Sequence, residues 1–148
     1  MPAARRLSAP LLALAGCAAL LGAALTASAS PAQDYMLYCM GCHGAEAQGV
    51  PGKIPPLAVS LARFMRSAEG RDYVLRVPGA ANSVLSDAQL AAVLNWLAER
   101  YGVPDAPAPP PLSAEEVGRV RHTPLANVQA TRRELLRKLG ADAPASDY

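Results

Sequence analysis

Five consecutive residues of this 148-residue chain, Cys39-Met40-Gly41-Cys42-His43, hold the only two cysteines that follow its hydrophobic N-terminal stretch. Two thiols and an imidazole this close together suit thiol redox exchange, metal binding or the covalent attachment of a cofactor. Each of these chemistries needs a different fold around the motif. The motif therefore limits what the chain can fold into, and the organisation of the other residues decides between the alternatives.

The first 29 residues have the form of a secretory signal peptide. Arg5 and Arg6 make a basic start, residues 7–25 form an apolar run, and residues 27–29 (ASA) have the small-residue pattern of a signal peptidase site. We expect cleavage after Ala29 and a periplasmic location for the remaining chain.

A second interpretation of the leader is a lipoprotein signal. Residues 14–17 (LAGC) resemble a lipobox in which Cys17 would carry the lipid. Residues 18–25 stay apolar, however, where a lipoprotein normally turns polar at once, so cleavage after Ala29 is favoured. An uncleaved leader acting as an anchor is a third alternative, and all three place the rest of the chain outside the cytoplasm.

Removal of the leader makes the chain formally neutral. Two of the 14 Lys and Arg residues, Arg5 and Arg6, lie in the leader, which leaves 12 basic against 12 acidic residues. The sequence therefore predicts no nucleic-acid partner, and a membrane partner only if Cys17 is lipidated or the leader is retained. Since Cys39 and Cys42 are the remaining cysteines, no structural disulfide framework is expected.

Helical spacing dominates the chain after the leader, and no strand-like alternation of useful length occurs. The clearest helix begins after Ser86, where Gln89 completes a capping box, and ends at Gly102. Ser113 and Glu116 form a second capping box. Shorter or less regular helices are expected over residues 32–42, 57–65, 70–77, 114–122 and 125–140.

The fold class is therefore all-α. We divide the mature chain into a small helical domain over 30–102, a Pro-rich linker over 103–112, a basic helical tail over 113–140 and a disordered C-terminus over 141–148. The prolines of the linker favour an extended arm over packed structure.

This organisation favours one chemistry for the motif. A redox dithiol of the thioredoxin type needs a strand before the cysteines, and the strands are missing. A tetrahedral zinc site needs four ligands, and His43 follows Cys42 too directly for both to close one tetrahedron easily with Cys39. Haem attachment needs only the motif: the two thiols form thioethers and His43 becomes the proximal iron ligand. We predict one haem c per chain, with dithiol chemistry or metal binding as alternatives.

Residues 33–102, about half the chain, resemble a class I mono-haem cytochrome c. The resemblance rests on CMGCHG, a loop with Gly49 and IPPL, the segment GRDYVLRV and the closing helix that begins LSDAQLAAVLNWL. It implies a small helical cytochrome c fold with covalent haem. It also implies that the carbonyl of Pro55 accepts a hydrogen bond from the other ring nitrogen of His43, which would fix the imidazole.

One loop departs from the family pattern. The family usually supplies a distal methionine before the closing helix, but residues 78–84 (PGAANSV) contain no Met and no His. Met65 is the best remaining candidate for a distal ligand, with core packing as its alternative. Trp96 is a candidate for packing against the haem, again with plain core packing as the alternative.

The expected function follows from the second axial ligand. With Met65 bound, the chain would be an exported electron-transfer protein for a periplasmic redox enzyme or respiratory chain, and not itself an enzyme. With an open iron, it would be a five-coordinate haem protein that binds a gas or peroxide, or the haem subunit of an oxidoreductase complex. We also expect redox partner proteins, and the basic tail over 113–140 is a candidate for contacting one.

Overall fold

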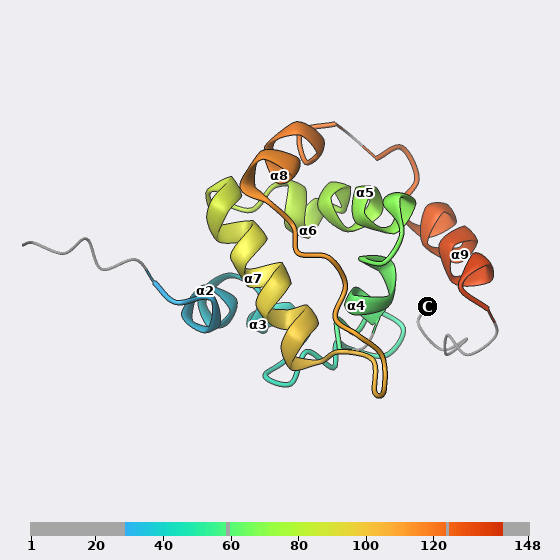
Figure 1. Cartoon of the computed structure of the whole chain (residues 1–148), viewed down its shortest axis with the longest axis horizontal. Coiled ribbons are helices and arrows are strands. Elements are labelled where there is room, and N and C mark those ends of the chain that lie inside the picture. Colours follow the sequence, from blue (N-terminus) through green and yellow to red (C-terminus); the bar gives the residue numbers. More distant parts are fainter. Residues whose placement is uncertain (1–28, 59, 124, 141–148) are drawn as a thin grey trace, which may run out of the picture.

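The structure, a computed structural model, describes residues 29–58, 60–123 and 125–140, so the predicted signal peptide and C-terminus lie outside the described residues, apart from Ala29. These described residues form helices without any strand, which confirms the all-α prediction, and a single antiparallel bridge joins Val50 and Ile54. The helices pack around a shared core (Figure 1). Their bounds are α2 (Pro31–Tyr38), α3 (Met40–His43), α4 (Ser60–Phe64), α5 (Ala68–Arg76), α6 (Pro78–Ala81), α7 (Asp87–Arg100), α8 (Ala114–Val120) and α9 (Val128–Lys138).

Side-chain caps explain where several helices begin. Ser86 caps α7 and forms the predicted capping box with Gln89, because each side chain bonds the other residue's backbone N–H. Ser30 and Gln33 make an equivalent box at α2. Ser113 caps α8 as predicted, but the carboxylate of Glu116 is bonded to a residue of α5 instead of closing the box.

The long helix α7 provides the largest share of the core. Its buried face is made of Leu90, Ala91, Val93, Leu94, Leu97 and Ala98. α2 crosses one side of α7, α4 lies against another, and α8 covers its N-terminal half (Figure 1). α5 packs on α4 and α8. The loop residues 78–84 were expected to be irregular, but Pro78 starts the short helix α6 there.

The Pro-rich segment over 103–112, for which we expect an extended arm, lies against the helical domain. Arg71 of α5 donates from Nη1 to the carbonyl oxygen of Pro110 at 2.6 Å and from Nη2 to that of Pro111 at 3.2 Å. The same guanidinium pairs with Glu116 of α8, with Nε–Oε1 at 2.7 Å and Nη2–Oε2 at 2.5 Å. One arginine thus holds both the arm and the first tail helix.

A second polar anchor lies nearer the middle of α7. The Asn95 side chain donates from Nδ2 to the carbonyl of Leu112 at 2.9 Å and accepts from the Leu112 N–H at 2.8 Å. Leu112 itself is buried, and Arg66 donates to the carbonyl of Pro107 further back along the arm. Because proline has no backbone N–H, this segment has few donors of its own for its carbonyl groups, and these side chains supply donors instead.

The tail folds back on the same domain, which was the alternative to partner binding. Val117 of α8 is fully buried, and Arg121 forms an ion pair with Asp87 of α7 at 2.8 Å. In α9, Leu135 and Arg132 are buried against the domain. Part of the apolar side of this helix is therefore buried within the chain, while Leu139 remains exposed.

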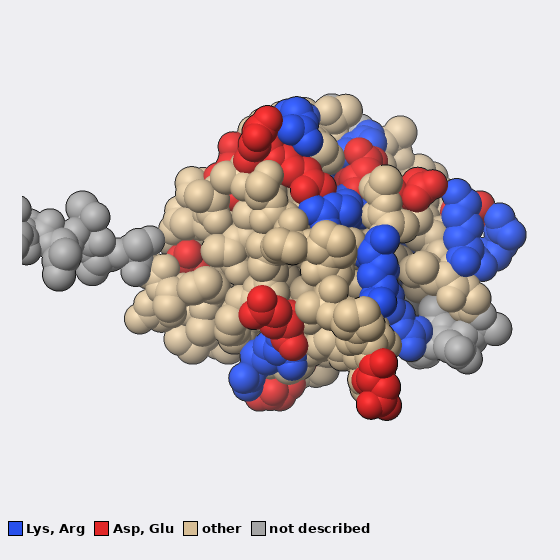
Figure 2. Space-filling model, in the orientation of Figure 1, with Lys and Arg blue, Asp and Glu red and all other residues tan. Residues whose placement is uncertain are grey.

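Charged side chains are unevenly spread over the surface. Figure 2 shows Lys and Arg gathered over α9, while the surface over α2 at the other end of the molecule carries few charges. Met36, Leu37 and Tyr38 of α2 are exposed there. No helix in the described part of the chain is long and apolar enough to cross a membrane.

Replacing Arg71 by methionine is expected to loosen the arm and α8 and to lower the free energy of unfolding by about 2 kcal/mol. The change removes hydrogen bonds to Glu116, Pro110 and Pro111 together, and it leaves partly buried acceptors without donors. Urea unfolding and amide hydrogen exchange over 103–120 would measure both effects. Arg119→Gln is the matched control, because its pair with Glu115 is exposed and should contribute less than about 0.5 kcal/mol.

The same ion pair predicts loss of stability in acid. Hydrogen bonding from Arg71 lowers the pKa of Glu116 below its ordinary value of 4.5. A lowered carboxyl pKa in the folded state stabilises the protein fully above the unfolded value and progressively less as the pH falls through the folded value. We therefore expect arm release below about pH 4.5, measured by hydrogen exchange against pH, and a weaker pH dependence in Glu116→Gln.

Candidate cofactor site

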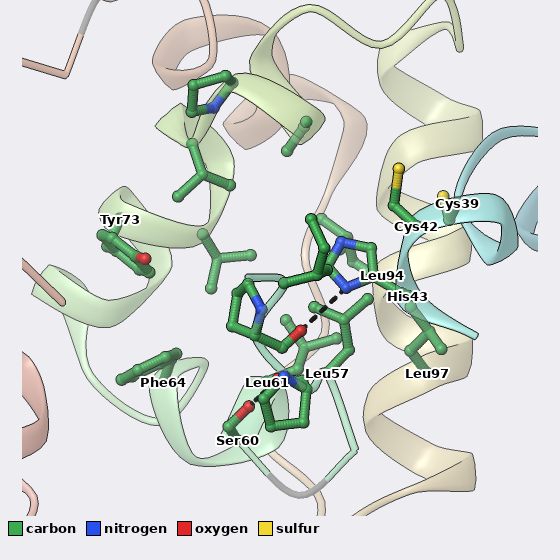
Figure 3. A pocket seen from close by; sticks show the side chains of 18 of the residues that line it. Cys39, Cys42, His43, Leu57, Ser60, Leu61, Phe64, Tyr73, Leu94 and Leu97 are labelled. Carbon is green, nitrogen blue, oxygen red and sulfur yellow. Dashed lines mark hydrogen bonds between the residues drawn. The ribbon is translucent and has the colours of Figure 1, made fainter. Parts of the chain in front are cut away.

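A cavity of about 370 Å³ lies between the Cys39–His43 motif, the following loop and helices α4 to α7. Figure 3 shows Cys39, Cys42 and His43 on one side of it, with Tyr73 and Phe64 across from them. Its size and mostly apolar wall are typical of a cofactor pocket. The apolar wall is built from Ile54, Pro55, Pro56, Leu57, Leu61, Phe64, Val74, Val77, Pro78, Ala80, Leu90, Val93, Leu94, Leu97 and Val128.

The motif spans a break between two helices that brings its reactive groups to the cavity edge. Cys39 ends α2, and α3 then carries Cys42 and His43. Cys42 is exposed and Cys39 is half-buried. Burial, with a contribution from the nearby Asp34 carboxylate, raises the pKa of the Cys39 thiol.

The imidazole of His43 is held by the loop that follows the motif. Its Nδ1 lies 3.0 Å from the carbonyl oxygen of Pro55. Because a carbonyl can only accept, Nδ1 carries the proton and Nε2 keeps its lone pair for a metal. Burial lowers the pKa of His43, although the bond to Pro55 opposes this shift, so the ring is neutral at physiological pH.

A tight turn places Pro55 against His43. The N–H of Gly49 donates to the carbonyl of His43 at 2.8 Å, and Val50 and Ile54 exchange hydrogen bonds at 2.8 and 2.9 Å. Gly49 has a φ of +68°, and a Cβ placed on it would lie 2.3 Å from the carbonyl oxygen of Ile54. Glycine is therefore needed for the loop to approach His43 this closely.

Gly49→Ala is expected to lower the stability of the cofactor-bound protein by about 2 kcal/mol or more. Left-handed backbone costs an alanine about 1 kcal/mol, and the clash with Ile54 adds to that cost. The thermal midpoint followed by absorbance of the bound cofactor would measure the loss. Gly52→Ala is a useful comparison, since Gly52 has a similar φ of +69° but open space around it.

The residues around the cavity fit a covalently attached haem. Two thiols stand beside an apolar cavity, and the free nitrogen of a neutral, oriented imidazole is available next to them. Zinc fits less well, because no group of three or more His, Cys, Asp or Glu side chains comes together among the described residues.

Comparison with known proteins agrees with this chemistry. The chain is 34% identical to a cytochrome c-552 of Thermus thermophilus over 121 aligned positions, covering 69% of this chain and 81% of that protein. The chain belongs to the c-type cytochromes. A second cytochrome c-552 of Thermus thermophilus is 33% identical over 102 positions, covering 56% of this chain and 78% of that protein. No protein-family model matches the chain.

Cytochrome membership confirms the family and fold predicted from the motif, and it implies haem-based electron transfer. The matched stretch is shorter in this chain than in its relatives. The first alignment has 121 positions but includes only 69% of 148 residues, about 102, so about 19 positions have no counterpart here. The second alignment, with 102 positions and 56% of the chain, gives the same difference of about 19.

Two residues proposed for the haem site do not line the cavity. Met65 is 1% exposed and packed in the core, so this placement does not support its role as an iron ligand. Trp96 lies on the α2 side of α7, where its ring is 5.7 Å from that of Tyr35. Its neighbours on α7, Leu94 and Leu97, face the cavity instead, because successive helical residues are turned by about 100°.

Tyr73 and Arg132 both line the cavity. The sequence interpretation gave Tyr73 the same candidate role as Trp96, packing against the haem, but it gave no such role to Arg132. Arg132 is 3% exposed, and its guanidinium carbon lies 5.2 Å from the centre of the Phe64 ring. A signal for it was present, since Arg132 lies four residues after Val128 and three before Leu135, on the apolar side of α9.

Proposed function

We propose that this chain is an exported c-type cytochrome that carries one haem c and transfers electrons between periplasmic redox proteins. Cys39 and Cys42 form the thioether bonds, and His43 is the proximal iron ligand. The observation that supports this most directly is the meeting of these three side chains at the edge of one apolar cavity. The name cytochrome c-552 of the relatives adds independent support.

The chain's own residues have separate tasks in this proposal. When bound, the haem supplies a one-electron couple at its iron. Pro55 fixes the tautomer and the plane of His43 through the Nδ1 hydrogen bond, which keeps the ligand geometry constant in both redox states. The mostly apolar wall would lower the polarity around the iron and thereby favour the less charged reduced state. A fixed site of this kind changes its redox state with little structural rearrangement.

Expression in a periplasm equipped for haem attachment tests the proposal. We expect covalent haem in a one-to-one ratio by pyridine haemochrome and intact mass, a reversible one-electron wave in spectroelectrochemistry, and rapid electron exchange with an unrelated c-type cytochrome in stopped flow. Covalent haem with no exchange would contradict the carrier function. Absence of covalent haem would contradict the whole proposal.

Export is the second part of the proposal, and it rests on the leader alone. The N-terminus of the mature protein distinguishes the alternatives: Ser30 after cleavage behind Ala29, a lipidated Cys17, or a retained leader. Intact mass of protein from the periplasmic and membrane fractions would separate them. We expect soluble protein that begins at Ser30, and a Cys17→Ala variant should behave identically.

A further inference from the structure

The cavity offers the iron few side chains besides His43. Histidine, methionine, cysteine and tyrosine are the protein ligands of haem iron. Of the described residues that line the cavity, these types are represented by Cys39, Cys42, His43 and Tyr73. Since the two cysteines are used for the thioethers, Tyr73 is the one remaining candidate among those lining residues.

The other histidine and the methionines lie elsewhere. The chain has two histidines, and His122 is exposed beyond α8. Among the methionines of the described chain, Met36 is 53% exposed on α2, Met40 lies between the cysteines, and Met65 is buried in the core away from the cavity wall. None of the three faces the cavity across from His43.

The far wall is short and largely apolar. α5 and α6 supply Val74, Val77, Pro78, Gly79 and Ala80, and only five residues separate α6 from α7. Pro78 and Gly79 are exposed although they line the cavity, so the wall is thin and open to solvent beside α6.

One charged side chain enters this apolar surrounding. Arg132 of α9 reaches the cavity with 3% of its surface exposed, one helical turn after Val128, which lines the same side. Its guanidinium is always protonated and carries several N–H donors. It packs over Phe64, which Figure 3 shows across the cavity from His43.

We infer that these residues leave the second axial position of the iron to a small exogenous ligand, and that Arg132 provides a hydrogen-bond donor for it. The chemical class is a small anion or polar diatomic, because a guanidinium N–H donor favours a ligand atom that accepts a hydrogen bond. Arg132 would contact the ligand itself and take no part in the haem attachment. This inference rests on the proposed haem site.

Spectroscopy of the purified holoprotein tests the inference separately from the proposed function. With covalent haem established first by pyridine haemochrome, we expect a high-spin ferric EPR signal, cyanide binding to the ferric form and rapid carbon monoxide binding to the ferrous form. Met65→Leu should leave all three unchanged. A low-spin ferric spectrum with resistance to both ligands would overturn the inference while leaving the proposed function intact.

Two variants test the residues of the far wall. Arg132→Gln should weaken cyanide binding about tenfold, the effect of one lost charge-assisted hydrogen bond, without changing the haem content. Arg133→Gln is the matched control, since Arg133 is exposed on the same helix. Equal cyanide affinity in both variants would overturn the role of Arg132. Tyr73→Phe should keep the ferric spectrum, and a change in it would identify Tyr73 as a ligand and overturn the open site.

Discussion

Replacing Cys39 and Cys42 together by alanine is expected to leave the chain without covalent haem and without a stable fold. In the proposed function these thiols are the attachment points, and both line the cavity of about 370 Å³. Without the cofactor, the apolar side chains that line this cavity would face water, which removes much of the burial that stabilises a small domain. Because the whole stability of such a domain is only about 5 to 15 kcal/mol, we expect the helices not to keep this arrangement.

Intact mass, pyridine haemochrome and far-ultraviolet circular dichroism measure the two effects in the same preparation. We expect the mass of the polypeptide alone and a collapsed or unfolded chain that lacks a cooperative thermal transition. Met40→Leu is the control within the motif, since it lies between the cysteines and conserves volume. A double variant that still carries covalent haem would contradict the assignment of the thioethers.

The helical boundaries and the haem motif were accessible from the sequence because both are local. The capping box of Ser86 and Gln89 involves only four consecutive residues, and the structure contains it at the predicted place. The Ser113 cap was predicted equally well, but Glu116 was not, because its carboxylate bonds Arg71, which is 45 residues away. The local sequence pattern is enough to predict that Ser113 caps α8. It cannot show that a distant arginine binds the Glu116 carboxylate, which would otherwise close the capping box.

The packed arm shows the opposite case. Its prolines predict an extended backbone, and the backbone is indeed without helix from Gly102 to Ser113. Extended backbone does not imply a free linker, however, because the proline carbonyls remain strong acceptors. Arg71 donates to the carbonyls of Pro110 and Pro111, and Asn95 donates to that of Leu112. These long-range contacts leave no trace in the local sequence pattern.

The haem cavity was also only partly predictable. The Cys39–His43 motif and the loop to Pro55 lie within 17 residues, so resemblance to the family was enough to pair Pro55 with His43 as the structure does. The far wall combines α5, α6 and α9, and which side of each helix faces the cavity depends on their packing. Met65 and Trp96 are predicted from their residue types, because methionine ligates haem iron and tryptophan packs against haem, yet neither lines the cavity. Arg132 does line it, but arginine is typical of a solvent-exposed helix face, so its residue type gave no reason to predict it.

Gly70→Ala is expected to destabilise the holoprotein by about 3 kcal/mol or more. Gly70 is buried at the start of α5, and a Cβ added there would lie 2.0 Å from the carbonyl oxygen of Phe64 and 2.7 Å from its carbonyl carbon. Overpacking usually costs about 1 to 3 kcal/mol, and the cost is at the upper end when the obstructing atoms belong to the backbone. The side chain of Ser67 caps α5 at the N–H of Gly70, so the helix cannot move away without losing its cap.

Urea unfolding of the holoprotein, followed by circular dichroism, measures this loss. Gly118→Ala is the matched control, because Gly118 is also helical and lies off the cavity wall, and its added Cβ would meet only the Asp87 side chain, at 2.7 Å. That control should lose less stability than Gly70→Ala, since a side chain can move aside more easily than backbone. A Gly70→Ala loss below about 1 kcal/mol would mean that α4 and α5 can separate freely. Separation would carry Phe64 and Leu61 away from Tyr73 and Val74, so the haem absorbance should shift in the same variant.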